Sequence, residues 1–367
     1  MRILYVAPKY DYGKPEQGYS FEHHNFYDFF ERSGHSIVYF DTLSLLEELG
    51  KEAMNRRLLE TAKAGQADIM FTVLFTDELD QAVVRRISEE TNTVTLNWFC
   101  DDHWRFDNYS RQWAPCFNWV VTTAKSAVPK YVRLPYPHAI KSQWGCNHLL
   151  YQKLDLPMEY DVSFVGQPHG NRRDVIRVLQ KNGIKVHTFG AGWRSGRVSQ
   201  DMMIRIFNQS RINLNLSNAS VSSDGDVPKL NPHLERVRRT LDHVPFGGQV
   251  KKLGAALLAL APAKNSVESV NAVNYFEQIK GRNFEVPGCG GFMLTGKADD
   301  LENYYQFGKE IVCFEDIHDL IDKIRYYLAH EEERAAIARA GYERTLREHT
   351  YTHRFEAIFK EMNLTHA

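Results

Sequence analysis

The segment 278–295 carries the side chains best suited to chemistry, in the sequence QIKGRNFEVPGCGGFMLT. Lys280 and Arg282 can offset the negative charge of phosphate groups. A carboxylate such as Glu285 can accept hydrogen bonds from both hydroxyls of a ribose. The glycines within 288–291 allow backbone N–H groups to approach a phosphate. Together these residue types predict a site for a nucleoside diphosphate.

Three polar residues follow a mostly apolar run, with Cys100 between, in the first half of the chain. Asp101, Asp102 and His103 come after TVTLNWF at 93–99. Ligands bind in the loops at the carboxyl edge of a parallel sheet, so one of the three can act as a general base or hold a ligand. Asp and His also cap helices, which leaves a structural role open. Their spacing fits no structural zinc pattern, and we expect no metal here.

Glycine-bearing loops follow the first strand-like run of each half. The loop at 8–24 contains Gly13 and Gly18, and the loop in the second half begins with Gly166 and Gln167. Glycine lets the backbone come close to a ligand because it has no Cβ. We therefore expect both loops to border a binding site.

Apolar runs that alternate with amphipathic stretches position these residues. Continuous apolar strands separated by helices indicate βαβ units and a parallel sheet covered on both faces. A polar, proline-containing stretch at 154–159 separates two such sets, so the predicted fold class is α/β with two doubly wound domains. The expected strands lie at 2–8, 36–40, 68–75, 93–99 and 119–124 in the first set, and at 161–166, 185–190, 211–217, 292–295 and 311–314 in the second.

Composition fits this architecture and excludes other classes. The chain has 367 residues, 43% of them hydrophobic, which suits two domains of ~150 residues and excludes disordered and fibrous proteins. Because 45 Lys+Arg balance 46 Asp+Glu, we do not expect an extended basic surface for binding polyanions. The five cysteines form no CxxC pair, which indicates reduced thiols. With no apolar run near the ~20 residues of a membrane span and no room for a signal peptide, we expect a soluble, cytoplasmic protein.

The second half of the chain resembles a known family. Residues 281–355 contain RNFEVPGCGG, GKEIVCFED, DLIDKIRYYL, RAAIARAGYERT and HTYTHR. This series is similar to the C-terminal half of GT-B glycosyltransferases, and especially to the group of the spore-maturation-protein glycosyltransferases, or glycosyl transferases group 1. The resemblance covers most of the second half well and the first half more loosely.

The resemblance implies the GT-B arrangement, in which two Rossmann-like domains face each other across a cleft. It implies an N-terminal acceptor domain at 1–155 and a C-terminal donor domain at 156–345, with an insertion at about 219–273. It also implies that a last helix within 346–367 crosses back to the first domain and sets closure of the cleft.

Donor-site roles follow from the same resemblance. Retaining GT-B families carry an E-x7-E motif whose second Glu binds the ribose, and Glu285 matches it in E-V-P-G-C-G. Glu277 matches the first Glu by spacing, although QIKGR replaces the usual E-G-F-G surroundings. Gly290 belongs to the small-residue run after Glu285, and Lys280 and Arg282 match phosphate ligands.

Two strand-end loops complete the implied donor site. In similar enzymes a basic residue after the first strand of the second domain meets the diphosphate, which makes Arg172 and Arg173 candidates. The next strand ends in TFGAGW, where Gly190 and Trp193 can flank the nucleobase. Trp193 can equally be a packing residue.

The resemblance thus implies transfer of a hexosyl or pentosyl group from a nucleotide-diphosphate sugar to an acceptor hydroxyl, without a cofactor or a metal ion. The E-x7-E motif favours retention at the anomeric carbon, and inversion stays open. Acceptors in such enzymes include glycans, lipid-linked glycans, proteins and modified nucleic acid bases. Two alternatives remain on the same fold: a non-catalytic nucleotide- or sugar-binding protein, and a nucleotide-sugar epimerase.

The insertion allows two interpretations. Its stretch 229–264 is basic and contains KKLGAALLALAPAK, so it can form an ordinary helical pair with a solvated basic face or make a weak contact with a membrane surface. The triplet DGD at 224–226 has the form of a metal-binding DxD signature, but its loop-like surroundings indicate a turn.

Overall fold

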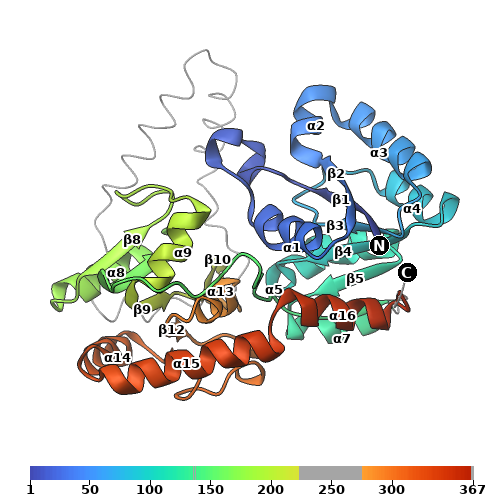
Figure 1. Ribbon diagram of the computed structural model, residues 1–367. Helices are drawn as coiled ribbons and strands as arrows, with labels where there is room; N and C mark the ends of the chain where they lie inside the picture. The colour runs from blue at the N-terminus through green and yellow to red at the C-terminus, as the bar shows by residue number, and fades with distance from the viewer. Residues whose placement is uncertain (135, 137, 223–274, 365–367) are drawn as a thin grey trace, which may run out of the picture.

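The computed structural model describes residues 1–134, 136, 138–222 and 275–364. Two parallel sheets, one in each half of the chain, form two α/β domains with helices on their faces (Figure 1). The predicted fold class is therefore confirmed. Apart from residues 219–222, the insertion lies outside the described residues, and so do its stretch 229–264 and the triplet at 224–226. No helix in the described part of the chain is long and apolar enough to span a membrane.

The N-terminal sheet has six parallel strands in the order β2-β1-β3-β4-β5-β6. The chain leaves β1 in one direction to form β2 and returns to its other side to form β3. Loops after β1 and β3 therefore meet at the switch point where such sheets bind ligands. The strands are β1 (Arg2–Ala7), β2 (Ser36–Asp41), β3 (Ile69–Thr72), β4 (Val94–Phe99), β5 (Trp119–Thr122) and β6 (Ala139–Lys141).

Alternation along β1 explains how this sheet is covered on both faces. Ile3 and Tyr5 pack in one apolar cluster, whereas Leu4 and Val6 pack in another on the opposite face, as the period of a strand requires. A short π-helical segment (His23–Tyr27) precedes α1. The helices of this domain are α1 (Asp28–Arg32), α2 (Thr42–Leu49), α3 (Lys51–Gly65), α4 (Gln81–Glu90), α5 (Asp102–Arg105), α6 (Arg111–Trp113) and α7 (Val128–Val132).

Strand β3 is shorter than the apolar run at 68–75 predicts, because it ends at Thr72. The buried carboxylate of Glu78 accepts hydrogen bonds from the backbone N–H groups of Phe75 and Thr76, each at 2.7 Å. These bonds satisfy backbone groups that would otherwise pair in a sheet, so the chain turns here. Residues 73–75 become a loop at the carboxyl edge.

The C-terminal sheet has five parallel strands in the order β13-β12-β9-β7-β8, so its switch point lies between β7 and β9. A separate antiparallel pair joins β10 (Asn218–Ser222) to β11 (Tyr275–Glu277). The sheet strands are β7 (Tyr160–Val165), β8 (Val186–Phe189), β9 (Ser210–Asn215), β12 (Met293–Gly296) and β13 (Val312–Phe314). The helices are α8 (Arg172–Lys181), α9 (Gln200–Asn208), α13 (Arg282–Gly288), α14 (Ile317–Ala329), α15 (Glu331–Glu348) and α16 (Tyr351–Glu361).

One apolar cluster passes without interruption from the first domain into the second. It contains Phe26 and Trp98 of the first domain, Phe207 and Phe284 of the second, and Phe355 of α16. The ring centroids of Phe355 and Phe30 are 4.5 Å apart. Figure 1 shows α16, in red, lying under the N-terminal domain after α15 has passed beneath the other sheet. The burial of these apolar side chains in one shared cluster therefore holds the two domains together. The boundaries at 155/156 and 345/346 stay predictions.

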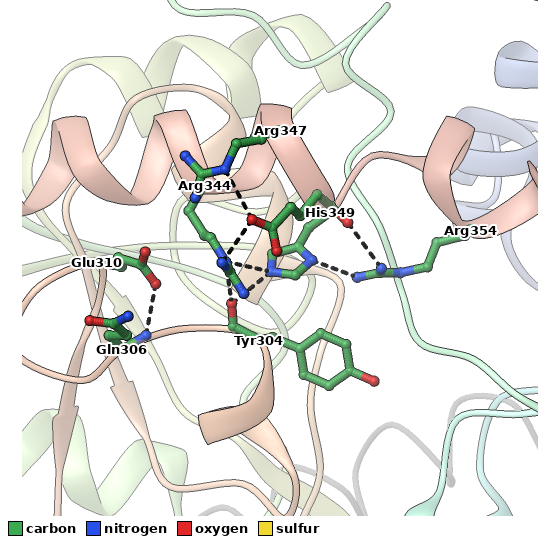
Figure 2. A network of polar contacts seen from close by, with 8 residues as sticks. Tyr304, Gln306, Glu310, Arg344, Arg347, His349 and Arg354 are labelled. Atoms are coloured by element: carbon green, nitrogen blue, oxygen red, sulfur yellow. Dashed lines mark hydrogen bonds and ion pairs between the residues drawn. The ribbon is translucent and has the colours of Figure 1, made fainter. Parts of the chain in front are cut away.

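The turn between α15 and α16 is fixed by a buried histidine (Figure 2). Nε2 of His349 donates to the carbonyl oxygen of Tyr304 at 2.6 Å, and Nδ1 accepts from Nη2 of Arg354 at 3.2 Å. Nε of Arg344 also lies 3.4 Å from Nε2, but the contact with the carbonyl oxygen, which can only accept, is much shorter. We therefore assign a neutral imidazole with its proton on Nε2. Burial and the nearby Arg354 lower the pKa of His349 to about 4. Arg354 also donates to the carbonyl oxygen of Trp144 at 3.1 Å, which ties the turn to the first domain.

Candidate functional site

A cavity of about 610 Å³, here called the main cavity, lies between the two domains. Its walls come from the loop and helix start at 11–25 of the first domain and from the strand-end loops of the second. Residues from both switch-point loops and from the start of α9 therefore face the same space. The lining residues include Asp11, Gly18, Tyr19, Phe21, Asn25, Tyr151, Gly166, Gln167, Gly190, Arg197, Ser199, Gln200, Asp201 and Arg282.

The loops after β7 and β8 form one wall of the main cavity, and three of the predicted donor residues lie there: Gly166, Gln167 and Gly190. Gly190 has φ +128°, and a Cβ at this position would stand 2.6 Å from the carbonyl oxygen of Gly166. Only glycine allows this approach of the two loops. The indole Nε1 of Trp193 donates to the same carbonyl at 2.7 Å. Trp193 thus fixes the loop and does not line the cavity, in line with the packing role left open by the sequence.

Arg282 forms the other polar wall and is held by a buried carboxylate. Its guanidinium Nη1 forms an ion pair with Oε2 of Glu285, three residues further along α13. Glu285 is fully buried and also accepts from the hydroxyl of Tyr151 at 2.8 Å and from Nδ2 of Asn25 at 3.3 Å. The Nε of Arg282 is buried and has no hydrogen-bond partner among the described residues. Glu285 therefore lies behind Arg282 instead of on the cavity surface that its implied ribose role requires.

Further cations gather around Arg282. Arg172 donates to the carbonyl oxygens of Gln167 at 2.9 Å and Leu216 at 2.8 Å, which follow β7 and β9, so it bridges the switch point. Burial, with a smaller contribution from Arg282, lowers the pKa of Arg172 to about 10. Burial lowers the pKa of Lys280 to about 8, against the opposing charge of Asp101. Three positive side chains named from the sequence therefore share one partly desolvated region.

Arg173, the neighbouring candidate, points elsewhere. Its Nη2 donates to the carbonyl oxygen of Gly192 at 2.6 Å, and its guanidinium lies 5.1 Å from the ring of Trp193. The helix turns by about 100° per residue, so only one of two adjacent arginines can face the switch point. That residue is Arg172.

The glycines of the two candidate loops have different surroundings. Gly18 lines the main cavity, whereas Gly13 is buried with φ +71°, and a Cβ there would meet Cβ of Leu43 at 2.8 Å. Gly290 follows α13 with φ +74°, and a Cβ there would meet the side chain of Lys153 at 3.0 Å. Gly13 and Gly290 therefore serve close packing. The side chain of Glu277, in β11, lies outside the described residues.

A second cavity, here called the small cavity, occupies the switch point of the first sheet. It has a volume of about 220 Å³ and shares Asp11 and Phe21 with the main cavity, so the two adjoin. Asp101 lines it, as the position after β4 predicts. Its other lining residues include Pro8, Tyr10, Tyr12, Ser20, Glu22, Val73, Phe75, Phe99, Cys100, Arg105 and Tyr109.

Asp102 and His103 do not line either cavity, although they are adjacent to Asp101. Asp102 begins α5, is 1% exposed, and accepts from the hydroxyl of Tyr131 at 2.9 Å. Burial lowers the pKa of His103 to about 4, so the imidazole is neutral near pH 7. The start of a helix turns successive side chains in different directions, which separates Asp101 from its neighbours. Asp102 has the structural role that the sequence left open.

Several lining residues were not singled out from the sequence. Glu22 lies in the small cavity, and burial together with Asp101 raises the pKa of its carboxyl. Arg197 crosses from the second domain to the first, where it pairs with the carboxylate of Asp11 and donates to the carbonyl oxygen of Gln17 at 3.0 Å. The sequence could have indicated Glu22 and Arg197 as site residues only because each is a charged residue in a segment that follows a predicted strand. Their partners, which come from distant segments, were not visible.

Comparison with known proteins shows which proteins share this architecture. Residues 233–360 match a family model described as glycosyl transferase-like. No curated protein matches the chain. Among solved structures, HepE from Anabaena in complex with UDP-glucose is similar with a TM-score of 0.60 and 10% identity, over 99% of each chain.

Two further structures give the same result. The sucrose-phosphate synthase of Thermosynechococcus elongatus has a TM-score of 0.58 and 9% identity, over 99% of this chain and 97% of that one. A glycosyltransferase from Rickettsia africae has a TM-score of 0.58 and 9% identity, over 98% of each chain. At such identities the likeness concerns the fold. The chain therefore has the GT-B glycosyltransferase fold, and its residues 233–360 match the glycosyl transferase-like family.

Proposed function

We propose that this chain is a glycosyltransferase that moves a sugar from a nucleoside diphosphate sugar to an acceptor hydroxyl. The observation that carries the proposal is the main cavity, which lies at the carboxyl edges of both sheets and has Arg282 in its wall. The buried Nε of Arg282 lacks a partner among the described residues, and a phosphate or ribose oxygen would supply one. The UDP and UDP-glucose complexes of HepE make uridine nucleotides the first donors to test.

The reaction would form a bond between the acceptor oxygen and the anomeric carbon while the bond from that carbon to the diphosphate oxygen breaks. The nucleoside diphosphate departs with the electron pair of the broken bond, gains negative charge as it does so, and takes up the acceptor proton on a phosphate oxygen. Arg282, Lys280 and Arg172 can offset this charge without a metal ion, because they lie together in a region shielded from water. The E-x7-E resemblance makes retention the stereochemical outcome that we propose.

The adjoining small cavity supports transfer over the two alternatives. A binding protein or an epimerase needs room for one nucleotide sugar, whereas a transferase needs a second space beside the anomeric carbon. The small cavity shares Asp11 and Phe21 with the main cavity and supplies that space.

Nucleotide binding and donor hydrolysis test the proposal. UDP, GDP, ADP, CDP and dTDP are compared by thermal shift, and the sugar derivatives of the nucleotide that binds are assayed for slow hydrolysis. We expect one nucleotide to stabilise the protein by ~2.7 kcal/mol at 100 times its Kd. Arg282→Lys keeps the charge opposite Glu285 but removes the planar fork, and should weaken binding at least ~10-fold.

Arg177→Lys is the matched control, because Arg177 is an exposed arginine of α8 that pairs with Asp174. Its nucleotide affinity should equal that of the unchanged protein. A panel in which no nucleotide stabilises the protein would overturn the donor site. Binding without turnover of any sugar derivative would favour the non-catalytic alternative.

A further inference from the structure

The small cavity combines acidic and aromatic side chains in a way that the main cavity does not. Glu22 and Asp101 line it together with Asp11, which pairs with Arg197, and Arg105 is the arginine among its described lining residues. The guanidinium of Arg105 lies 3.9 Å from the ring centroid of Tyr109, and its Nη1 donates to the carbonyl oxygen of Phe75 at 3.2 Å. Carboxylates thus outnumber cations among the described residues that line the small cavity, whereas basic side chains surround Arg282.

The two carboxylates have different surroundings. Asp101 accepts from Nε2 of Gln278 at 3.4 Å and faces the positive charge of Lys280, so the second domain holds it. Glu22 belongs to the segment that connects the loop at 8–20 to the π-helix. Its carboxyl interacts with the Ser20 hydroxyl and lies in the field of Asp101. Among the described residues, the groups that interact with the Glu22 carboxyl thus belong to the first domain.

Aromatic rings frame the opening of the small cavity. Tyr12 and Phe75 meet edge to face with centroids 5.9 Å apart, and both are exposed, at 50% and 41%. Exposed aromatic rings beside carboxylates suit a ligand with an apolar face and several hydroxyl groups. The volume of about 220 Å³ is below the ~300–1,000 Å³ of pockets for drug-sized ligands, so a single ring fits.

Charge restricts the ligand further. Burial and the like charge of Asp101 already raise the pKa of the Glu22 carboxyl, and an anionic group in the small cavity would face Asp101 and add to that charge. In this partly buried space like charges repel more strongly than in water. Hydroxyl groups can instead donate hydrogen bonds to both carboxylates. A neutral sugar ring can therefore bind both carboxyl groups without adding charge, whereas a phosphorylated or carboxylated ring adds a negative charge beside them.

We propose that the small cavity is the acceptor subsite, that it takes a neutral sugar ring, and that Glu22 with Asp101 excludes acidic sugars from it. The assignment of this cavity to the acceptor rests on the proposed function. The cavity adjoins the main cavity through Asp11 and Phe21, so a ring bound in it would lie next to the space proposed for the donor. Glu22 is thus a residue that determines acceptor specificity.

Two probes with the same ring test the charge requirement: methyl glucoside and methyl glucuronide, which differ only at C6. Their binding to the full chain is measured by saturation-transfer NMR with the nucleotide from the panel present. We expect the unchanged protein to bind the glucoside at least ~10-fold more tightly than the glucuronide. Glu22→Gln keeps the shape of the side chain and removes its charge, and should reduce this ratio to below ~3.

Asp107→Asn is the matched control, because Asp107 is exposed and pairs with Lys130 outside both cavities. Its ratio should equal that of the unchanged protein. If Glu22→Gln does not fold by circular dichroism, Asp101→Asn replaces it with the same expected loss of discrimination. A ratio unchanged by the substitution, equal binding of the two probes, or binding of neither would overturn the inference. The nucleotide thermal shift tests the donor site independently, so its absence marks failure of the proposed function instead.

Discussion

We expect Glu285→Ala to lower the free energy of unfolding more than the substitution of any exposed residue does. The carboxylate is fully buried and serves Arg282, Tyr151 and Asn25. Its removal leaves the guanidinium of Arg282 without its counter-ion, and breaking a buried ion pair in this way costs ~3–5 kcal/mol. The hydroxyl of Tyr151 also loses its acceptor, which costs ~1–3 kcal/mol.

Two features reduce the sum. The side chain of Arg282 is 25% exposed, so water from the main cavity can hydrate part of the guanidinium. Nδ2 of Asn25 keeps a bond to the carbonyl oxygen of Phe21 at 3.2 Å. We therefore expect Glu285→Ala to lower the free energy of unfolding by about 4 kcal/mol. Glu285→Gln, which keeps an acceptor for Tyr151, should cost about 2 kcal/mol.

Urea unfolding gives these values if circular dichroism and tryptophan fluorescence report the same transition. Glu356→Ala, on the exposed face of α16, is the control and should change stability by less than ~0.5 kcal/mol. The double variant with Arg282→Ala should cost less than the sum of the single changes, because no unpaired charge remains. A loss below ~1 kcal/mol for Glu285→Ala, or strict additivity in the double variant, would refute the reasoning.

Three other perturbations test particular parts of the site. Gly190→Ala should push the loop of Gly166 away and lower nucleotide affinity in calorimetry, whereas Gly183→Ala, with φ +78° and nothing within 4 Å, should cost stability only. Because the pKa of Lys280 is about 8, nucleotide affinity should fall between pH 7 and 9 as the ammonium loses its proton, and Lys280→Met should remove that dependence. The pKa of His349 is about 4 in the folded protein, so only unfolded chains take up its proton between pH 6.5 and 4. Stability should fall by ~3 kcal/mol as pH drops through that range, and His349→Gln should flatten the urea-derived profile.

The fold could be predicted because its strands are buried on both faces. The run at 3–8 is apolar throughout, which is typical of a strand covered by helices on both sides. Strand ends were less certain. The run at 68–75 continues past Thr72, yet Glu78 binds the backbone there and ends the strand. An apolar side chain alone does not distinguish a strand from the wall of a cavity.

Site residues could be predicted as far as the loop that carries them. Asp101 reaches a cavity because it follows β4, but the same rule named Asp102, whose side chain turns inward to Tyr131. Glu285 was recognised by motif, whereas its partners come from residues 260 and 134 positions away along the chain, Asn25 and Tyr151. Such contacts depend on how the two domains pack against each other. They cannot be predicted from the spacing of residues within one segment of the sequence.

The docking itself links the two proposed subsites. Glu285 holds Arg282 at the main cavity and at the same time accepts a hydrogen bond from Asn25 of the first domain. Asn25 lies three residues after Glu22 on the segment that borders the small cavity. A shift of this segment would move Glu22 and disturb the acceptor for Asn25 together. The position of Arg282, the proposed donor ligand, is therefore coupled through one buried carboxylate to the position of Glu22, the residue proposed for the acceptor side.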